Sequence, residues 1–171
     1  MNVPNFLTFI RFVLIPIFVT LFFKQNNVEI NFYCIGIFLV SGLTDIFDGY
    51  IARKYNMITK LGTLMDPLAD KLTILTILFC LCIKNYIPVW VFVVVLLKEI
   101  CMVLGAARLY KKDVVIPANY YGKSATIVFY LAIILSFLKI KHNIIFFVIA
   151  IIMAIFALVK YFNNYKSVIK E

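Results

Sequence analysis

Four aspartates within 26 residues are the most chemically informative feature of this sequence. Asp45 and Asp48 are three residues apart and Asp66 and Asp70 are four apart, in segments otherwise rich in apolar residues. Residues with these spacings share one face of a helix. A carboxylate inside hydrocarbon is costly, so an ionisable residue there usually marks a functional site. Four carboxylates also repel one another unless a cation lies among them, which favours a metal site.

The ligand type narrows the choice of metal. Carboxylate oxygens are hard ligands that suit magnesium, manganese or calcium rather than a soft metal. Four carboxylates are enough to hold two divalent ions about 4 Å apart, an arrangement that clamps the attacking and leaving oxygens in phosphoryl displacement. We therefore expect two Mg2+ or Mn2+ ions, held by Asp45, Asp48, Asp66 and Asp70. A purely structural role for the aspartates is disfavoured, because no nearby basic residues in the spans could neutralise all four.

Residues beside the aspartates suit a phosphate-bearing ligand. Gly49 allows backbone or substrate to approach closely, although for Gly49 taken alone helix packing is the better explanation. Arg53 and Thr59 follow at the expected mouth of the site, where a guanidinium could hold a phosphate.

The elements that must position these residues are membrane helices. Of the 171 residues, 64% are hydrophobic, whereas about half are apolar in a soluble domain. A helix needs about 20 mainly apolar residues to cross a bilayer. Runs of about this length predict spans over residues 6–23, 30–53, 62–83, 86–108, 122–138 and 143–162. We expect one all-α, six-span membrane domain over residues 1–171, and residues 2–11 also permit a short interfacial helix before the first span.

The net charge of +9 is explained by membrane topology rather than by nucleic-acid binding. With the N-terminus in the cytoplasm, most basic residues at helix ends lie on the cytoplasmic side. Only Lys24, Lys84, Lys139 and Lys141 lie on the opposite side. This asymmetry follows the positive-inside rule. Both aspartate pairs then lie roughly 6–12 Å inside the cytoplasmic ends of the second and third spans, at 1.5 Å per residue. As antiparallel neighbours, these spans would bring the pairs to one spot.

The motif around the aspartates resembles that of a known family. The pattern is Asp45-x-x-Asp48-Gly49-x-x-Ala52-Arg53, then eight residues, then Gly62-x-x-x-Asp66-x-x-x-Asp70. It is similar at every fixed position to the motif of the CDP-alcohol phosphotransferases. The resemblance implies a six-helix integral membrane enzyme, typically a homodimer, that uses divalent metal ions to displace CMP from a CDP-linked lipid or alcohol.

The resemblance also implies roles for individual residues. Asp45, Asp48 and Asp66 would be metal ligands, and Asp70 would both bind metal and act as the base on the acceptor hydroxyl. The CDP part of the donor would be contacted by Gly49, Arg53 and Thr59.

The opening residues resemble the bacterial members of this family that transfer a phosphatidyl group from CDP-diacylglycerol to sn-glycerol 3-phosphate. In those members an Asn-x-x-Thr-x-x-Arg pattern, here Asn5, Thr8 and Arg11, lies by the nucleotide. The resemblance implies an enzyme of the bacterial inner membrane that contacts membrane lipids and has its active site facing the cytoplasm.

The acceptor can also be argued from charge. Glycerol 3-phosphate is a dianion, so its pocket needs cations beyond the metals. Arg108 and Lys123, at helix ends that we expect to face the cavity, are the candidates. Lys98 and Glu99 resemble a further element of these enzymes, and Glu99 is expected to pair with a nearby cation.

Besides an inactive lipid-binding homologue, which the presence of every motif aspartate disfavours, two alternatives stay open. One is the same chemistry with another acceptor, namely inositol, inositol phosphate, serine or phosphatidylglycerol. The other is a divalent-cation transporter that uses the aspartates as a permeation site. It is disfavoured because the outer half of the spans offers no matching polar pathway.

Overall fold

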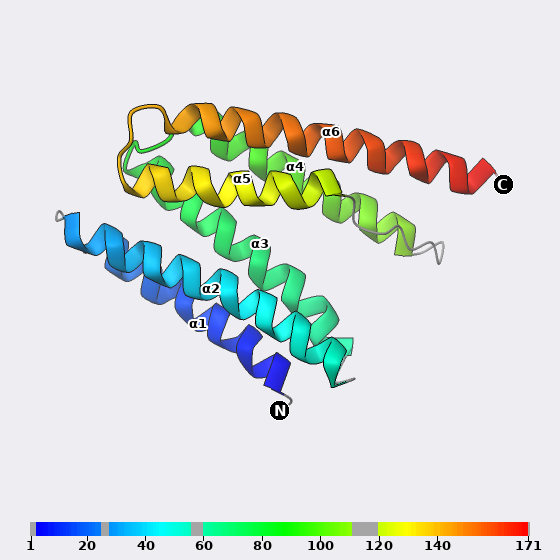
Figure 1. Cartoon of the computed structure of the whole chain (residues 1–171), viewed down its shortest axis with the longest axis horizontal. Coiled ribbons are helices and arrows are strands. Elements are labelled where there is room, and N and C mark those ends of the chain that lie inside the picture. Colours follow the sequence, from blue (N-terminus) through cyan, green and yellow to red (C-terminus); the bar gives the residue numbers. More distant parts are fainter. Residues whose placement is uncertain (1–2, 25–27, 56–59, 111–119, 171) are drawn as a thin grey trace. The chain divides into compact units, whose positions relative to one another are not determined.

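The computed structural model describes the whole chain except residues 1–2, 25–27, 56–59, 111–119 and 171. In the described residues it forms six α-helices and no strand (Figure 1). They are α1 (Val3–Phe23), α2 (Val28–Lys54), α3 (Lys60–Ile83), α4 (Val89–Tyr110), α5 (Tyr120–Phe137) and α6 (Asn143–Lys170). The predicted all-α class is confirmed.

Three helices are long and apolar enough to cross a membrane. Over the described residues these stretches are Phe6–Phe23, Asn31–Ile51 and Asn143–Lys160, and Ser124–Phe137 is a shorter apolar helix. Much of their surface is apolar and exposed, as in Ile152 of α6, which suits contact with lipid chains. The membrane character is therefore confirmed, and the count of six spans stays a prediction.

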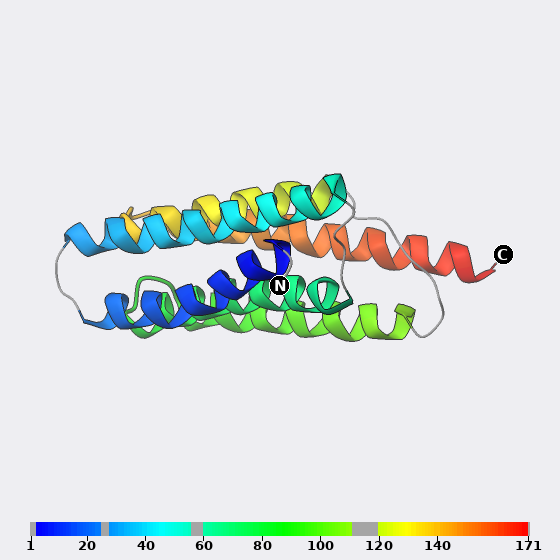
Figure 2. The same cartoon turned by 90° about the horizontal axis from the view of Figure 1, so that it is seen from below.

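The first of two compact units covers Met1–Lys84 and contains α1, α2 and α3. Here α1 packs against both α2 and α3, whereas α2 and α3 contact each other only sparsely (Figures 1 and 2). The sequence predicted α2 and α3 as direct neighbours, so the intervening position of α1 is a correction. The physical reason for this position of α1 is that it buries large apolar side chains, such as Phe18 and Phe22, within the unit.

The helix α1 is continuous over residues 3–11, which belong to the stretch for which the sequence permits a separate interfacial helix. It runs from Val3 to Phe23 with Pro16 inside it, and Thr8 and Arg11 are buried. A separate N-terminal interfacial helix is therefore not formed in the part of the chain that is described. Burial of polar side chains on α1 draws its first turns into the unit rather than along a membrane surface.

The second compact unit covers Asn85–Glu171, where α6 packs along α5 and also contacts α4. The buried Asn143 side chain donates hydrogen bonds to the Tyr86 carbonyl at 3.2 Å and to the Ser136 hydroxyl at 2.9 Å. Lys98 and Glu99 form an ion pair on α4, as expected for Glu99. The prediction of one domain over residues 1–171 stays a prediction.

Candidate functional site

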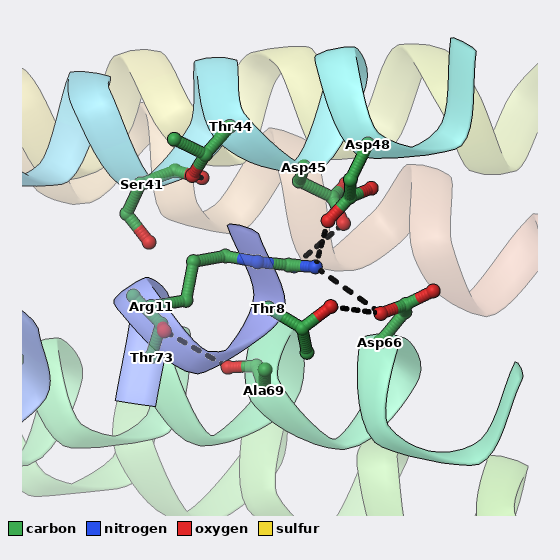
Figure 3. Close-up of polar contacts among 9 residues, drawn as sticks. All are labelled: Thr8, Arg11, Ser41, Thr44, Asp45, Asp48, Asp66, Ala69 and Thr73. Carbon is green, nitrogen blue, oxygen red and sulfur yellow. Dashed lines mark hydrogen bonds and ion pairs between the residues drawn. The ribbon is translucent and has the colours of Figure 1, made fainter. Parts of the chain in front are cut away.

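The centre of the site is the buried guanidinium of Arg11, which reaches from α1 to two aspartates of α2 (Figure 3). Its Nη1 donates to Asp45 Oδ1 and its Nη2 to Asp48 Oδ2, each over 2.6 Å. Such charge-assisted hydrogen bonds are shorter and stronger than neutral ones, and the planar fork allows both at once. Arg11 therefore fixes the positions of both α2 carboxylates.

The third carboxylate reaches the same centre from α3. Asp66 Oδ1 lies 3.7 Å from Arg11 Nη2 and accepts a hydrogen bond from the Thr8 hydroxyl. Thr8 and Arg11 are three residues apart on α1, so they share one face of that helix. In Figure 3 the guanidinium lies between the two α2 aspartates on one side and Asp66 on the other. Three helices thus contribute to one polar centre.

The carboxylates differ in their access to the surroundings. The side chains of Arg11 and Asp48 expose only 1% and 3% of their surface, while Asp45 exposes 40% and Asp66 31%. Two of the three carboxylates can therefore be approached from outside, and Asp48 forms the inner wall. An ion or a charged ligand would enter on the side of Asp45 and Asp66.

The hydroxyl groups of Thr44 and Thr73 bond to backbone carbonyls rather than to the carboxylates. The Thr44 hydroxyl donates to the Ser41 carbonyl over 2.7 Å, and the Thr73 hydroxyl donates to the Ala69 carbonyl over 2.8 Å (Figure 3). Each of these bonds stays within its own helix, as is common for threonine inside a helix. The polar contacts drawn to Asp45, Asp48 and Asp66 therefore come from α1.

The predicted convergence of the two aspartate pairs is found for three of the four residues. Asp45, Asp48 and Asp66 meet at Arg11, and Asp70, half-buried, follows one turn after Asp66 on α3. Among the described side chains, no three of the His, Cys, Asp or Glu type are gathered closely enough to hold a metal ion as they stand. The carboxylates instead surround the guanidinium.

The donor set nevertheless fits a divalent cation. Three carboxylates and one guanidinium carry a formal charge of −2, taken as three negative charges and one positive. Carboxylate oxygens are the ligands that magnesium and manganese prefer. The residual negative charge, with Asp70 one turn away, favours a further cation at this place.

Other predicted site residues are only partly described. Gly49 lies on α2 directly after Asp48 and is half-buried. Asn5, Arg53, Arg108 and Lys123 lie in helices, but their side chains are outside the described part, and Thr59 lies wholly outside it.

The position of Arg11 is the main result that the sequence did not predict. Thr8 and Arg11 were expected beside a nucleotide, and the structure places both on the aspartates. A signal was present, because an arginine in the middle of an apolar run needs a counter-ion within the membrane. Apart from Lys71 and Lys98, it is the only basic residue well inside the predicted spans.

Comparisons with known proteins show which family and which named proteins this chain is similar to. A family model described as CDP-alcohol phosphatidyltransferase matches residues 1–159. A Rickettsia typhi protein named CDP-diacylglycerol–glycerol-3-phosphate 3-phosphatidyltransferase is 44% identical over 73 residues, which are 43% of this chain and 40% of that protein. A Bacillus subtilis protein of the same name is 33% identical over 136 residues, 73% of this chain and 70% of that protein.

A relative with another name is similar to a comparable extent. A Streptomyces coelicolor protein named cardiolipin synthase (CMP-forming) is 31% identical over 129 residues, 74% of this chain and 60% of that protein. The match to the Rickettsia typhi protein spans less than half of the length of either chain.

Proposed function

Since the chain belongs to the CDP-alcohol phosphatidyltransferase family, we propose that it transfers a phosphatidyl group from CDP-diacylglycerol to sn-glycerol 3-phosphate. The products are phosphatidylglycerophosphate and CMP, so the reaction is a step of phospholipid biosynthesis. The observation that carries the proposal is the meeting of the motif aspartates Asp45, Asp48 and Asp66 at one centre. The names of the Rickettsia typhi and Bacillus subtilis relatives support this choice of substrates.

The proposed cofactor is a pair of Mg2+ or Mn2+ ions. Enzymes of this family generally depend on divalent metal. When bound by Asp45, Asp48, Asp66 and Asp70, such ions would neutralise the charge that develops on the transferring phosphoryl group. The carboxylate donor set and the net negative charge of the centre support this assignment.

Asp70 is proposed as the catalytic base. Its carboxylate takes the proton from the 1-hydroxyl of sn-glycerol 3-phosphate as that oxygen attacks the phosphorus that carries the diacylglycerol. A new P–O bond forms, the P–O bond to CMP breaks, and CMP leaves. Positioning and electrostatic stabilisation provide most of the catalysis in phosphoryl transfer. The place of Asp70, one turn from Asp66 and half-buried, supports this role.

Substrate contacts are proposed for residues around this centre. Those assigned to CDP-diacylglycerol are Asn5, Thr8, Arg11, Gly49, Arg53 and Thr59. Arg108 and Lys123 are assigned to the phosphate of the acceptor, because a dianion needs cations beyond the metal. The enzyme is proposed to act as a homodimer in the bacterial inner membrane, with acyl chains remaining in lipid and the site open to the cytoplasm.

A second candidate acceptor is phosphatidylglycerol, which the similarity to the relative named cardiolipin synthase favours. An acceptor panel decides between them. The purified chain in detergent is supplied with CDP-diacylglycerol and Mg2+, and CMP release is measured with glycerol 3-phosphate, phosphatidylglycerol, serine, inositol or inositol phosphate. We expect release with glycerol 3-phosphate, and the Asp45→Asn variant provides the blank. Faster release with phosphatidylglycerol would assign the second activity instead.

A cation transporter would behave differently in the same preparation. In proteoliposomes without nucleotide it would carry Mn2+ across the bilayer. We expect no flux above that of protein-free liposomes. Asp45, Asp48 and Asp66 lie together at one polar centre, and the outer half of the predicted spans offers no polar pathway that continues from it.

A further inference from the structure

The guanidinium of Arg11 lies where a cation shared by three carboxylates would lie. Its two Nη atoms are 2.6 Å from Asp45 Oδ1 and Asp48 Oδ2, and Nη2 is 3.7 Å from Asp66 Oδ1. A magnesium ion needs oxygen ligands at about 2.0–2.1 Å in near-octahedral geometry. The carboxylate oxygens that contact Arg11 cannot close around an ion while the guanidinium is between them.

Arg11 is held at its tip alone. Its Nε is buried and has no hydrogen-bond partner in the described part of the chain, whereas both Nη atoms are engaged. A buried donor without a partner is unfavourable. Arg11 is therefore held by strong contacts at its two Nη atoms, while its Nε lacks a hydrogen bond among the described residues. This unsatisfied donor lowers the free energy that a competing cation needs to displace the guanidinium.

We infer that Arg11 is an internal counter-ion for the metal-free centre, and that its guanidinium leaves Asp45, Asp48 and Asp66 when a divalent cation binds. The inference rests on the metal use proposed above. Like charges at this spacing repel strongly in a poorly solvated site, so the two cations compete for the same oxygens. The apparent metal affinity is then the intrinsic affinity multiplied by the fraction of molecules in which Arg11 is unpaired from the carboxylates.

This exchange gives Arg11 two successive roles. In the metal-free protein it keeps three carboxylates from repelling one another inside the membrane. Once released, it is a cation beside a centre at which the phosphates of the donor bind, which agrees with the contact to CDP-diacylglycerol proposed for Arg11.

The test measures metal binding rather than turnover. The full chain is purified in detergent, stripped with EDTA and dialysed, and free Mn2+ is followed by electron paramagnetic resonance during titration. The variants are Arg11→Met, which removes the cation, and Arg11→Lys, which keeps a charge without the planar fork. Lys84→Met is the matched control, because Lys84 is a cation of the same unit whose Nζ donates to the Phe22 carbonyl near the C-terminal end of α1.

We expect the Kd for Mn2+ to fall by about tenfold or more in Arg11→Met, by a smaller factor in Arg11→Lys, and not at all in Lys84→Met. The apparent Tm of the metal-free Arg11→Met protein falls, and Mn2+ raises it by more than it raises that of the wild type. If Arg11→Met does not fold, the change in Kd of Arg11→Lys decides.

Other outcomes separate this inference from the proposed function. Equal or weaker Mn2+ binding in the Arg11 variants overturns the displacement and leaves phosphatidyl transfer standing. Tighter binding in the variants, with no CMP release by the wild type with any acceptor, overturns the proposed function and supports the displacement. No Mn2+ binding by any of the proteins overturns the displacement together with the metal assignment.

Discussion

Arg11 Nη2 donates a hydrogen bond to Asp48 Oδ2 over 2.6 Å, and the two side chains expose only 1% and 3% of their surface. The same guanidinium pairs with Asp45 at the same distance, but Asp45 is 40% exposed. The two ion pairs therefore differ in solvation while sharing one partner. Removing one member of a buried ion pair costs more stability than removing one member of an exposed pair, because no water can replace the lost partner of the remaining charge.

We expect Asp48→Asn to destabilise the metal-free protein by about 2 kcal/mol, the contribution of a hydrogen bond to a charged group, because Arg11 keeps its contact with Asp45. Asp45→Asn should cost about 1 kcal/mol or less, as for exposed pairs. Thermal unfolding of both variants in detergent with EDTA provides the comparison, and each serves as the control for the other. Equal losses of stability would show that the difference in exposure between Asp45 and Asp48 does not affect the free energy of unfolding.

The base assignment predicts that Asp70→Asn lowers CMP release by about 100-fold or more, the usual contribution of a general base. Asparagine keeps the size of the side chain but cannot take up the proton of the acceptor. Leu72→Ile, an exposed apolar position on the same helix, is the control and should keep wild-type turnover. Normal CMP release by Asp70→Asn would refute the assignment.

Metal removal should abolish the reaction. The proposed phosphoryl transfer depends on divalent charge among the carboxylates, so EDTA should stop CMP release and excess Mg2+ or Mn2+ should restore it. Calcium, which accepts longer and less regular coordination, is expected to restore less. A preparation that works at full rate in EDTA, and contains no metal by elemental analysis, would exclude the metal-assisted reaction.

The proposed orientation can be tested by thiol labelling. Native Cys34 and Cys80 are buried, and a background without the four cysteines carries either His142→Cys or Tyr55→Cys, both at exposed positions. In intact spheroplasts a membrane-impermeant maleimide should label the cysteine at 142 and reach the one at 55 only after lysis. The reverse pattern would place the carboxylate centre at the outer face.

The second unit offers a test of stability that is independent of the site. Asn143 is buried and bonds both Tyr86 and Ser136. Asn143→Ala should cost about 1–3 kcal/mol, because a buried polar partner loses its hydrogen bond. His142→Ala, at the neighbouring exposed position, should leave the apparent Tm within a degree or two of the wild type and thus serves as the control.

The positions of the helices could be predicted well from hydropathy, and the main exception is the end of the last helix. The second helix, expected over residues 30–53, is found at Val28–Lys54. The last was expected to end at residue 162 and continues to Lys170. Hydropathy detects the apolar stretch of a helix, and over the described residues of α6 the candidate span is Asn143–Lys160. The backbone hydrogen bonds of a helix are satisfied internally, so a helix can continue beyond its apolar stretch.

The site was predictable to the extent that spacing along one helix determines it. The separations of Asp45 from Asp48 and of Asp66 from Asp70 fix their shared faces. Which helix separates the two pairs is a matter of packing between segments distant in sequence, and a single sequence does not contain it. The ion pair of Arg11 with Asp45 spans 34 residues, and only the structure places the arginine between the aspartates.

The position of α1 in the first unit has a consequence for biogenesis. Arg11 leaves the ribosome before any of the acidic residues that it contacts, and all of these contacts lie within Met1–Lys84. Inserting an aspartate at the middle of a span costs about 2.5–3.5 kcal/mol on translocon scales. The nascent chain therefore carries the neutralising cation into the bilayer first, and its polar centre can assemble while the last three helices are still being synthesised.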